Sequence, residues 1–217
     1  MPDPFAVTDC ALIAIATGEK AHNLRELLSR LIHTEDQEIL YYHFWGGLLR
    51  PHFVDPEYPN DFAAWAYHDL HDRRLAEKMA ILHPGRHGSM ERLRRQMIDV
   101  IEDRLDEDVL AGRIEAEHPF FFLRSQIVVF DTGIRVERPE NLADVIPALS
   151  ASSIFYHLID AHRRTASGEN DFSEWMQSFD NHYRQVAGKV SAIDLSFHSL
   201  TELREILSQI FQDNFAA

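Results

Sequence analysis

The chain has 217 residues, of which 45% are hydrophobic, and its 14 Phe and three Trp suffice for a buried core in one domain or in two closely packed halves. A formal net charge of -14 disfavours binding to nucleic acid or to an anionic membrane, because both need a basic surface. Cys10 is the single cysteine, so no intrachain disulfide can form and a reducing compartment is expected.

The start of the chain predicts no targeting segment. Met-Pro-Asp-Pro lacks the basic residues and the long apolar core of a signal peptide. No apolar run approaches the roughly 20 residues that span a bilayer. We therefore expect a cytoplasmic protein.

The first predicted element is a strand over residues 5–17, and a matching stretch covers residues 120–131. The later stretch is rich in β-branched and aromatic residues, which predicts a buried strand. A Pro-Phe pair and a Thr-Gly pair have the same separation in both stretches, so we extend the strand prediction to the first. Gly18 and Gly133 are each expected to supply a turn at the end of the strand.

An amphipathic helix is predicted after each strand. Apolar residues recur at the spacing of one helical face over residues 21–32, and a shorter match covers residues 142–149. Later helices are predicted from Asn60 to about Ile81, from Asn170 to about Ile193, over residues 89–105, and over residues 199–214.

Between these helices, residues 35–49 and 153–163 predict a further matching pair. The expected N-caps are Thr34 for the first of them and Ser150 or Ser152 for the second. Gly46 and Gly47 lie inside the first helix, where each costs about 1 kcal/mol relative to alanine. We expect another helix or a ligand to approach this backbone closely.

The sequence Asn-Asp-Phe-x-x-Trp occurs at residues 60–65 and again at residues 170–175, each time after a Tyr-His pair. This recurrence indicates a tandem duplication, with a first repeat at 1–110 and a second at 117–217. The predicted fold class is α+β, mainly helical, and the repeating unit is strand-helix-helix-loop-helix-helix. Because a lone strand cannot satisfy its backbone hydrogen bonds, we expect the two strands to pair in a small central antiparallel sheet. The repeats would then form one intertwined body with pseudo-twofold symmetry.

His43 and His157, which follow Tyr42 and Tyr156, are the first candidates for a functional site. Paired imidazoles near the pseudo-axis could act as acid, base or ligand near neutral pH. Alternatively, each Tyr-His pair lies on a half-buried helix and forms hydrogen bonds with a neighbouring loop. We favour this structural interpretation, because buried polar groups normally find such partners.

Asp61 and Asp171 allow two interpretations as well. Each could orient the histidine of its own repeat or bind a metal. Alternatively, Asn60 and Asn170 cap helices, and each aspartate complements the positive helix end, which is the interpretation we favour. The aromatic residues that follow are interpreted as apolar anchors. Together, the ligand-binding candidates are Tyr42, His43, Trp45, Asp61, Trp65, Tyr156, His157, Asp171 and Trp175.

A metal site is the alternative hypothesis for the first repeat, which is rich in histidine. His68 and His71 are three residues apart in a predicted helix and would share one face. The groups that could complete the site are His43, His52, Asp55 and Glu57. The second repeat has Ser178 and Asn181 at the positions of the histidine pair.

Segments 16–18, 23–27, 42–45 and 57–65, which include His-Phe-Trp and Tyr-Pro-Asn-Asp-Phe, resemble an uncharacterised bacterial and archaeal family known only as a domain of unknown function. The resemblance covers nearly the whole chain. Relatives of this kind are sometimes joined to glycosyltransferases or encoded beside them. The resemblance thus implies an accessory role in carbohydrate metabolism, with no catalytic residues to transfer.

No complete catalytic motif is present, so the sequence leaves enzymatic activity open. We expect a non-catalytic accessory module that uses no cofactor and binds a small molecule or a partner such as a glycosyltransferase. The alternative is a metal-dependent hydrolase that uses the histidine-rich first repeat with a divalent metal. Neither nucleic acid nor membrane is an expected partner, and the chain could form a homo-oligomer.

Overall fold

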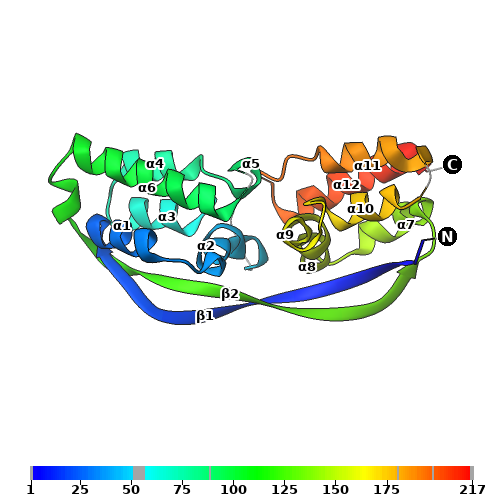
Figure 1. Cartoon of the computed structure of the whole chain (residues 1–217), viewed down its shortest axis with the longest axis horizontal. Coiled ribbons are helices and arrows are strands. Elements are labelled where there is room, and N and C mark those ends of the chain that lie inside the picture. The colour runs from blue at the N-terminus through cyan, green and yellow to red at the C-terminus, as the bar shows by residue number, and fades with distance from the viewer. Residues whose placement is uncertain (1, 51–56, 88, 180, 197, 216–217) are drawn as a thin grey trace. The chain divides into compact units, whose positions relative to one another are not determined.

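In the computed structural model, residues 2–50, 57–87, 89–179, 181–196 and 198–215 are described. The described chain is mainly helical, with one antiparallel pair of strands, so the predicted α+β class is confirmed. Strand β1 covers Phe5–Asn23 and strand β2 covers Glu115–Val136. Figure 1 shows both strands. Both are longer than predicted.

The chain forms two compact units, which we call the central unit and the split unit. The central unit is Leu12–Gln126, and the split unit combines Met1–Ala11 with Ile127–Ala217. These bounds differ from the predicted repeats 1–110 and 117–217, because each unit includes strand residues from the other repeat. The first part of β1 belongs with the helices of the second repeat, and the first part of β2 belongs with those of the first repeat.

The central unit contains six α-helices among its described residues. They are α1 (Leu24–His33), α2 (Gln37–Leu49), α3 (Asp61–His68), α4 (Arg73–Ala80), α5 (Pro84–His87) and α6 (Met90–Glu107), followed by the 3-10 turn η1 (Ala111–Arg113). Leu24, Leu27 and Leu31 of α1 are buried in the core of this unit, as their spacing predicts. The predicted cap Thr34 is wrong, because Asp36 accepts the hydrogen bond of the Glu38 amide and caps α2.

The helices of the split unit are shorter and include more turns. They are η2 (Pro139–Asn141), α7 (Leu142–Val145), η3 (Ile146–Ala148), α8 (Ala151–Ile154), η4 (Phe155–Asp160), α9 (Ala161–Arg164), α10 (Asp171–Gln177), η5 (Asn181–Tyr183), α11 (Arg184–Ser191) and α12 (Leu200–Phe215). Segment η4 is a π-helix that joins α8 to α9. Ser150 caps α8 through the amide of Ser153, so this predicted cap is confirmed.

Both helices predicted to start at an Asn-Asp pair do so, but each ends earlier than expected. Asn60 and Asn170 accept a hydrogen bond from the amide three residues later and are the N-caps of α3 and α10. Helix α3 stops at His68, and His71 has a positive φ of 54°, which an α-helix does not allow. Asp72 then caps the separate helix α4.

The two strand glycines do not end the strands, which corrects that prediction. Gly18 lies within β1 at φ 84° and Gly133 lies within β2 at φ 76°, conformations that side chains disfavour. The preceding threonines bridge to the partner strand. The hydroxyl of Thr17 donates to the Phe122 carbonyl over 2.7 Å, and that of Thr132 donates to the Val7 carbonyl over 2.6 Å.

Candidate functional site

His43 of α2 is the centre of a polar network in the central unit. Its side chain is only 3% exposed. Nδ1 lies 2.8 Å from an oxygen of Asp61, and Nε2 accepts the backbone N–H of Leu123, on β2, over 3.0 Å. Arg50 donates to both oxygens of the same carboxylate, over 2.7 and 2.9 Å. The imidazole therefore ties a strand to the helices of this unit.

These contacts define the proton position on the ring. Nε2 accepts a hydrogen bond, so the proton is on Nδ1 and is donated to Asp61. Burial lowers the pKa of His43, against the opposing influence of Asp61. Burial raises the pKa of Asp61, but hydrogen bonds and charge from His43 and Arg50 outweigh it and lower that pKa overall. The histidine is thus neutral beside an ionised carboxylate.

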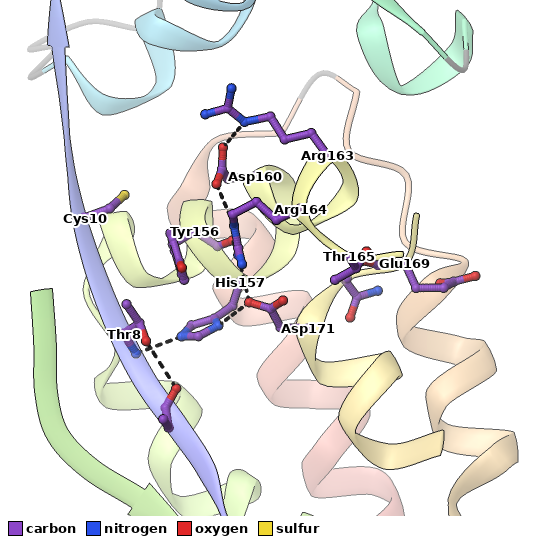
Figure 2. A network of polar contacts seen from close by, with 12 residues as sticks. Thr8, Cys10, Tyr156, His157, Asp160, Arg163, Arg164, Thr165, Glu169 and Asp171 are labelled. Atoms are coloured by element: carbon purple, nitrogen blue, oxygen red, sulfur yellow. Dashed lines mark hydrogen bonds and ion pairs between the residues drawn. The ribbon is translucent and has the colours of Figure 1, made fainter. Parts of the chain in front are cut away.

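The split unit contains the same arrangement around His157, shown in Figure 2. The side chain of His157 is 3% exposed. Nδ1 lies 2.7 Å from an oxygen of Asp171, and Nε2 accepts the backbone N–H of Thr8, on β1, over 2.8 Å. Arg164 donates to the same carboxylate oxygen over 2.9 Å. In both units, the aspartate binds the histidine of its own repeat and also lies in the first turn of a helix capped by the preceding asparagine, so the contacts of both interpretations are present.

The network of the split unit extends to a buried carboxylate. Asp160, the last residue of η4, is 1% exposed and accepts hydrogen bonds from Arg163 over 2.5 Å and from Arg164 over 2.8 Å (Figure 2). The guanidinium of Arg164 also lies 3.8 Å from the ring centre of Tyr156. Burial lowers the pKa of Arg164, but its hydrogen bonds with Asp171 and Asp160 raise it overall.

The central unit has Gly46 where the split unit has Asp160, three residues after the histidine. A Cβ on Gly46 would lie 3.1 Å from the Tyr42 ring and 3.4 Å from Leu12 of β1. The backbone at Gly46 is closely approached, as predicted, but by Tyr42 of the same helix and by a strand residue and not by another helix or a ligand. At Gly47 the nearest atom to such a Cβ would be a guanidinium nitrogen of Arg50 at 4.0 Å, so the prediction is wrong there.

Aromatic side chains complete the site in the central unit. The ring of Phe120 stacks on Phe62 at 4.7 Å and lies 4.6 Å from the His43 ring. Trp65 contacts the same phenylalanine at 5.7 Å, and its indole N–H donates to the His118 carbonyl over 2.8 Å. These anchors thus hold β2 rather than leaving an open aromatic surface.

The split unit repeats these aromatic contacts around Phe5. Its ring stacks on Phe172 at 5.1 Å and lies 4.8 Å from His157 and 5.3 Å from Trp175. The indole N–H of Trp175 donates to the Asp3 carbonyl over 2.8 Å. The remaining ligand-binding candidate, Trp45, is buried and meets the His83 ring edge-on at 4.8 Å.

The structure separates the two histidines proposed for a metal site. His68 ends α3 and its ring contacts Tyr67, whereas His71 lies outside the helix and is 2.7 Å from Glu117. They therefore do not share a helical face. Of the other proposed ligands, His52 and Asp55 lie outside the described residues. Within the described part of the chain, no three His, Cys, Asp or Glu side chains are grouped to hold a metal ion.

Sequence reasoning missed Arg50 and Arg164, although each donates hydrogen bonds to the aspartate that binds the histidine. A signal was present, because an arginine follows each Tyr-His pair at the same distance, seven residues after the histidine. The strand amides that bind the imidazoles could not be identified in this way. A backbone N–H is present at almost every position, so the side-chain pattern does not single it out.

The buried neutral histidine predicts a pH-dependent stability. The pKa of His43 is lowered from 6.5 in the folded state, so below that pH the unfolded chain binds the proton first. The contribution of His43 to the free energy of unfolding is fully present above pH 6.5. It falls as the pH drops from there toward the pKa of the folded state, by up to about 1.4 kcal/mol per pH unit. Urea denaturation between pH 7.5 and 5 would measure the loss, and the His43→Leu variant should show a smaller slope.

Cys10 is expected to be unreactive in the folded protein. The thiol is buried beside the Ser152 carbonyl at 3.4 Å, and burial, with Asp160 and Asp9 adding to it, raises the pKa to about 12. Because the thiolate is the nucleophile, alkylation at pH 8 should be at least about 100-fold slower than in denaturant. Mass spectrometry of iodoacetamide-treated samples would measure the rate of alkylation. Equal rates in the two states would contradict this burial.

The fold and the site together define a mainly helical α+β protein in which buried His-Asp pairs attach two long strands to helices. The chain belongs to DUF5752, a family of unknown function, whose model matches residues 2–212. It is similar to the structure of OrfY from Thermoproteus tenax, with 25% identity and a TM-score of 0.82, over 99% of this chain and 96% of that one. The comparison with curated proteins gives no match. None of the helices in the described part combines the length and apolar character needed to cross a membrane.

Proposed function

We propose that this protein is a non-catalytic accessory module that binds a partner protein or a small molecule. The observation that carries the proposal is the state of the two imidazoles, the strongest acid-base candidates in the sequence. Both ring nitrogens of His43 and of His157 are engaged, by a carboxylate on one side and by a strand amide on the other. A histidine that transfers protons or binds a metal needs a ring nitrogen that can reach the substrate or the ion.

Exposed apolar side chains support a protein partner. On the β2 segment of the split unit, Val129, Phe130 and Ile134 are 49%, 50% and 44% exposed. Large apolar groups on a protein surface often mark an interaction site. The partner we propose is a glycosyltransferase, in keeping with the relatives that the sequence resembles, and the role would be an accessory one in carbohydrate metabolism.

The test is a binding measurement by biolayer interferometry between the purified chain and glycosyltransferases from the same genome. We expect at least one to bind with micromolar affinity, and the Val129→Ser/Phe130→Ser double variant to bind at least tenfold more weakly. Phe121→Ser is the matched control, because Phe121 is also an exposed β2 aromatic, 58% accessible, but belongs to the central unit. Failure of every glycosyltransferase to bind would contradict the proposed partner.

The metal-dependent hydrolase is distinguished from the accessory module by elemental analysis of protein purified without a histidine tag. Stoichiometric zinc, iron or manganese that is lost in a His68→Ala/His71→Ala variant would favour the enzyme. A metal-free protein that still binds its partner would favour the accessory module.

We also infer that the two halves arose by tandem duplication. The support is that His, Asp, Arg, Asn, Trp and Phe occupy matched positions and make matched contacts in the two units. An ancestral half would have bound an extended strand of another copy, and fusion would have placed both copies in one chain.

A further inference from the structure

Each unit holds an extended segment by one set of contacts, which we call the strand socket. In the split unit the segment is residues 3–10. The carbonyl of Asp3 accepts from the Trp175 indole, the Phe5 ring enters the aromatic cluster, and the Thr8 amide donates to His157. Lastly, the thiol of Cys10 donates to the Ser152 carbonyl over 3.4 Å.

The central unit holds residues 118–125 by the same groups at the same spacing. The contacting residues of the segment are His118, Phe120, Leu123 and Ser125. The hydroxyl of Ser125 donates to the Glu38 carboxylate and also lies 3.3 Å from the Glu38 carbonyl, which matches the carbonyl contact of Cys10. Two of these contacts use only the backbone of the segment, and the others use a phenyl ring and a small thiol or hydroxyl. The strand socket therefore recognises an extended peptide with one buried aromatic residue.

The segment and the socket of the split unit are far apart along the chain. After residue 11, the chain passes through the whole central unit, Leu12–Gln126, before it reaches the helices that hold residues 3–10. A second copy presents the identical segment, so exchange between copies would preserve every contact within the socket. We propose that the strand socket of the split unit is an interaction site that accepts residues 3–10 of a second copy of this chain.

Intramolecular docking competes with this exchange, because a tethered segment has a high effective concentration. The test therefore uses two full-length variants with complementary defects. Phe5→Ala weakens the segment and leaves the socket intact, whereas Trp175→Ala damages the socket and leaves the segment intact. The segment of the Trp175→Ala chain can then enter the socket of the Phe5→Ala chain.

Light scattering coupled to size exclusion would measure the mass before and after mixing equal amounts of the two variants. We expect a species of twice the 25.1 kDa chain mass, at least fivefold more abundant in the mixture than in either variant alone. Mixing either variant with itself is the control. No increase on mixing, with both variants folded by circular dichroism, would overturn the proposal.

Variants that fail the folding check have replacements that each remove one hydrogen bond of the strand socket. Trp175→Phe keeps an aromatic ring but removes the N–H that donates to Asp3, and Thr8→Pro removes the amide that donates to His157. These two variants are mixed in the same way, because Trp175→Phe alters the socket and Thr8→Pro alters the segment. A two-chain species that is specific to the mixture supports exchange, and its absence contradicts it.

Discussion

Phe120→Ala is expected to lower the free energy of unfolding by about 3–5 kcal/mol, the usual cost of removing a buried phenylalanine ring. The ring is only 5% exposed and lies 4.6–4.7 Å from the rings of His43 and Phe62. Its removal leaves a cavity between β2 and the helices of the central unit. Urea denaturation followed by circular dichroism would measure the loss.

The adjacent residue provides a matched control for this prediction. Phe121 is 58% exposed, since successive side chains of a strand point to opposite faces. Phe121→Ala should therefore change the free energy of unfolding by less than about 0.5 kcal/mol. Equal losses for the two variants would show that the strand is not held by the buried ring.

His43→Leu is expected to cost about 2–4 kcal/mol, because it keeps much of the side-chain volume but removes both hydrogen bonds of the imidazole. The amide of Leu123 loses its acceptor in a partly buried environment, and Asp61 keeps its contacts with Arg50. Removing one partner of a buried pair costs more than the pair itself contributes. Urea denaturation at pH 7.5 would measure this difference.

A surface histidine serves as the control for His43→Leu. His33, at the end of α1, is exposed and forms one hydrogen bond, with the Ser29 carbonyl over 2.7 Å. His33→Leu should change the free energy of unfolding by less than about 1 kcal/mol. If His43→Leu were equally mild, the imidazole would not be what attaches β2 to the helices.

Much of the local structure was predictable, because it depends on residues close together in the sequence. The asparagines of both Asn-Asp-Phe segments cap helices, since a cap binds an amide only three residues away. Pairing between the two strands followed from the fact that a lone strand cannot satisfy its backbone. The helix breaks near residues 69–72 were missed, because Asp72 and the positive φ of His71 interrupt an otherwise helical pattern.

The candidate site was only partly predictable, because its key contacts join distant residues. Asp61 was considered as the partner of His43, but nothing in the local pattern shows that the other ring nitrogen binds a strand of the other repeat. Periodicity reports which face of an element is buried and not which element covers it. The sequence predicts that the repeats are intertwined, but which helices each strand packs against emerged only from the structure.

The central claim is that each imidazole holds a strand from the other repeat by accepting its backbone N–H. Through-hydrogen-bond NMR couplings in ¹⁵N-labelled protein would detect these bonds directly. The account predicts a correlation between the Leu123 amide and His43 Nε2 and another between the Thr8 amide and His157 Nε2, with both rings protonated on Nδ1. Rings protonated on Nε2, without either correlation, would contradict it.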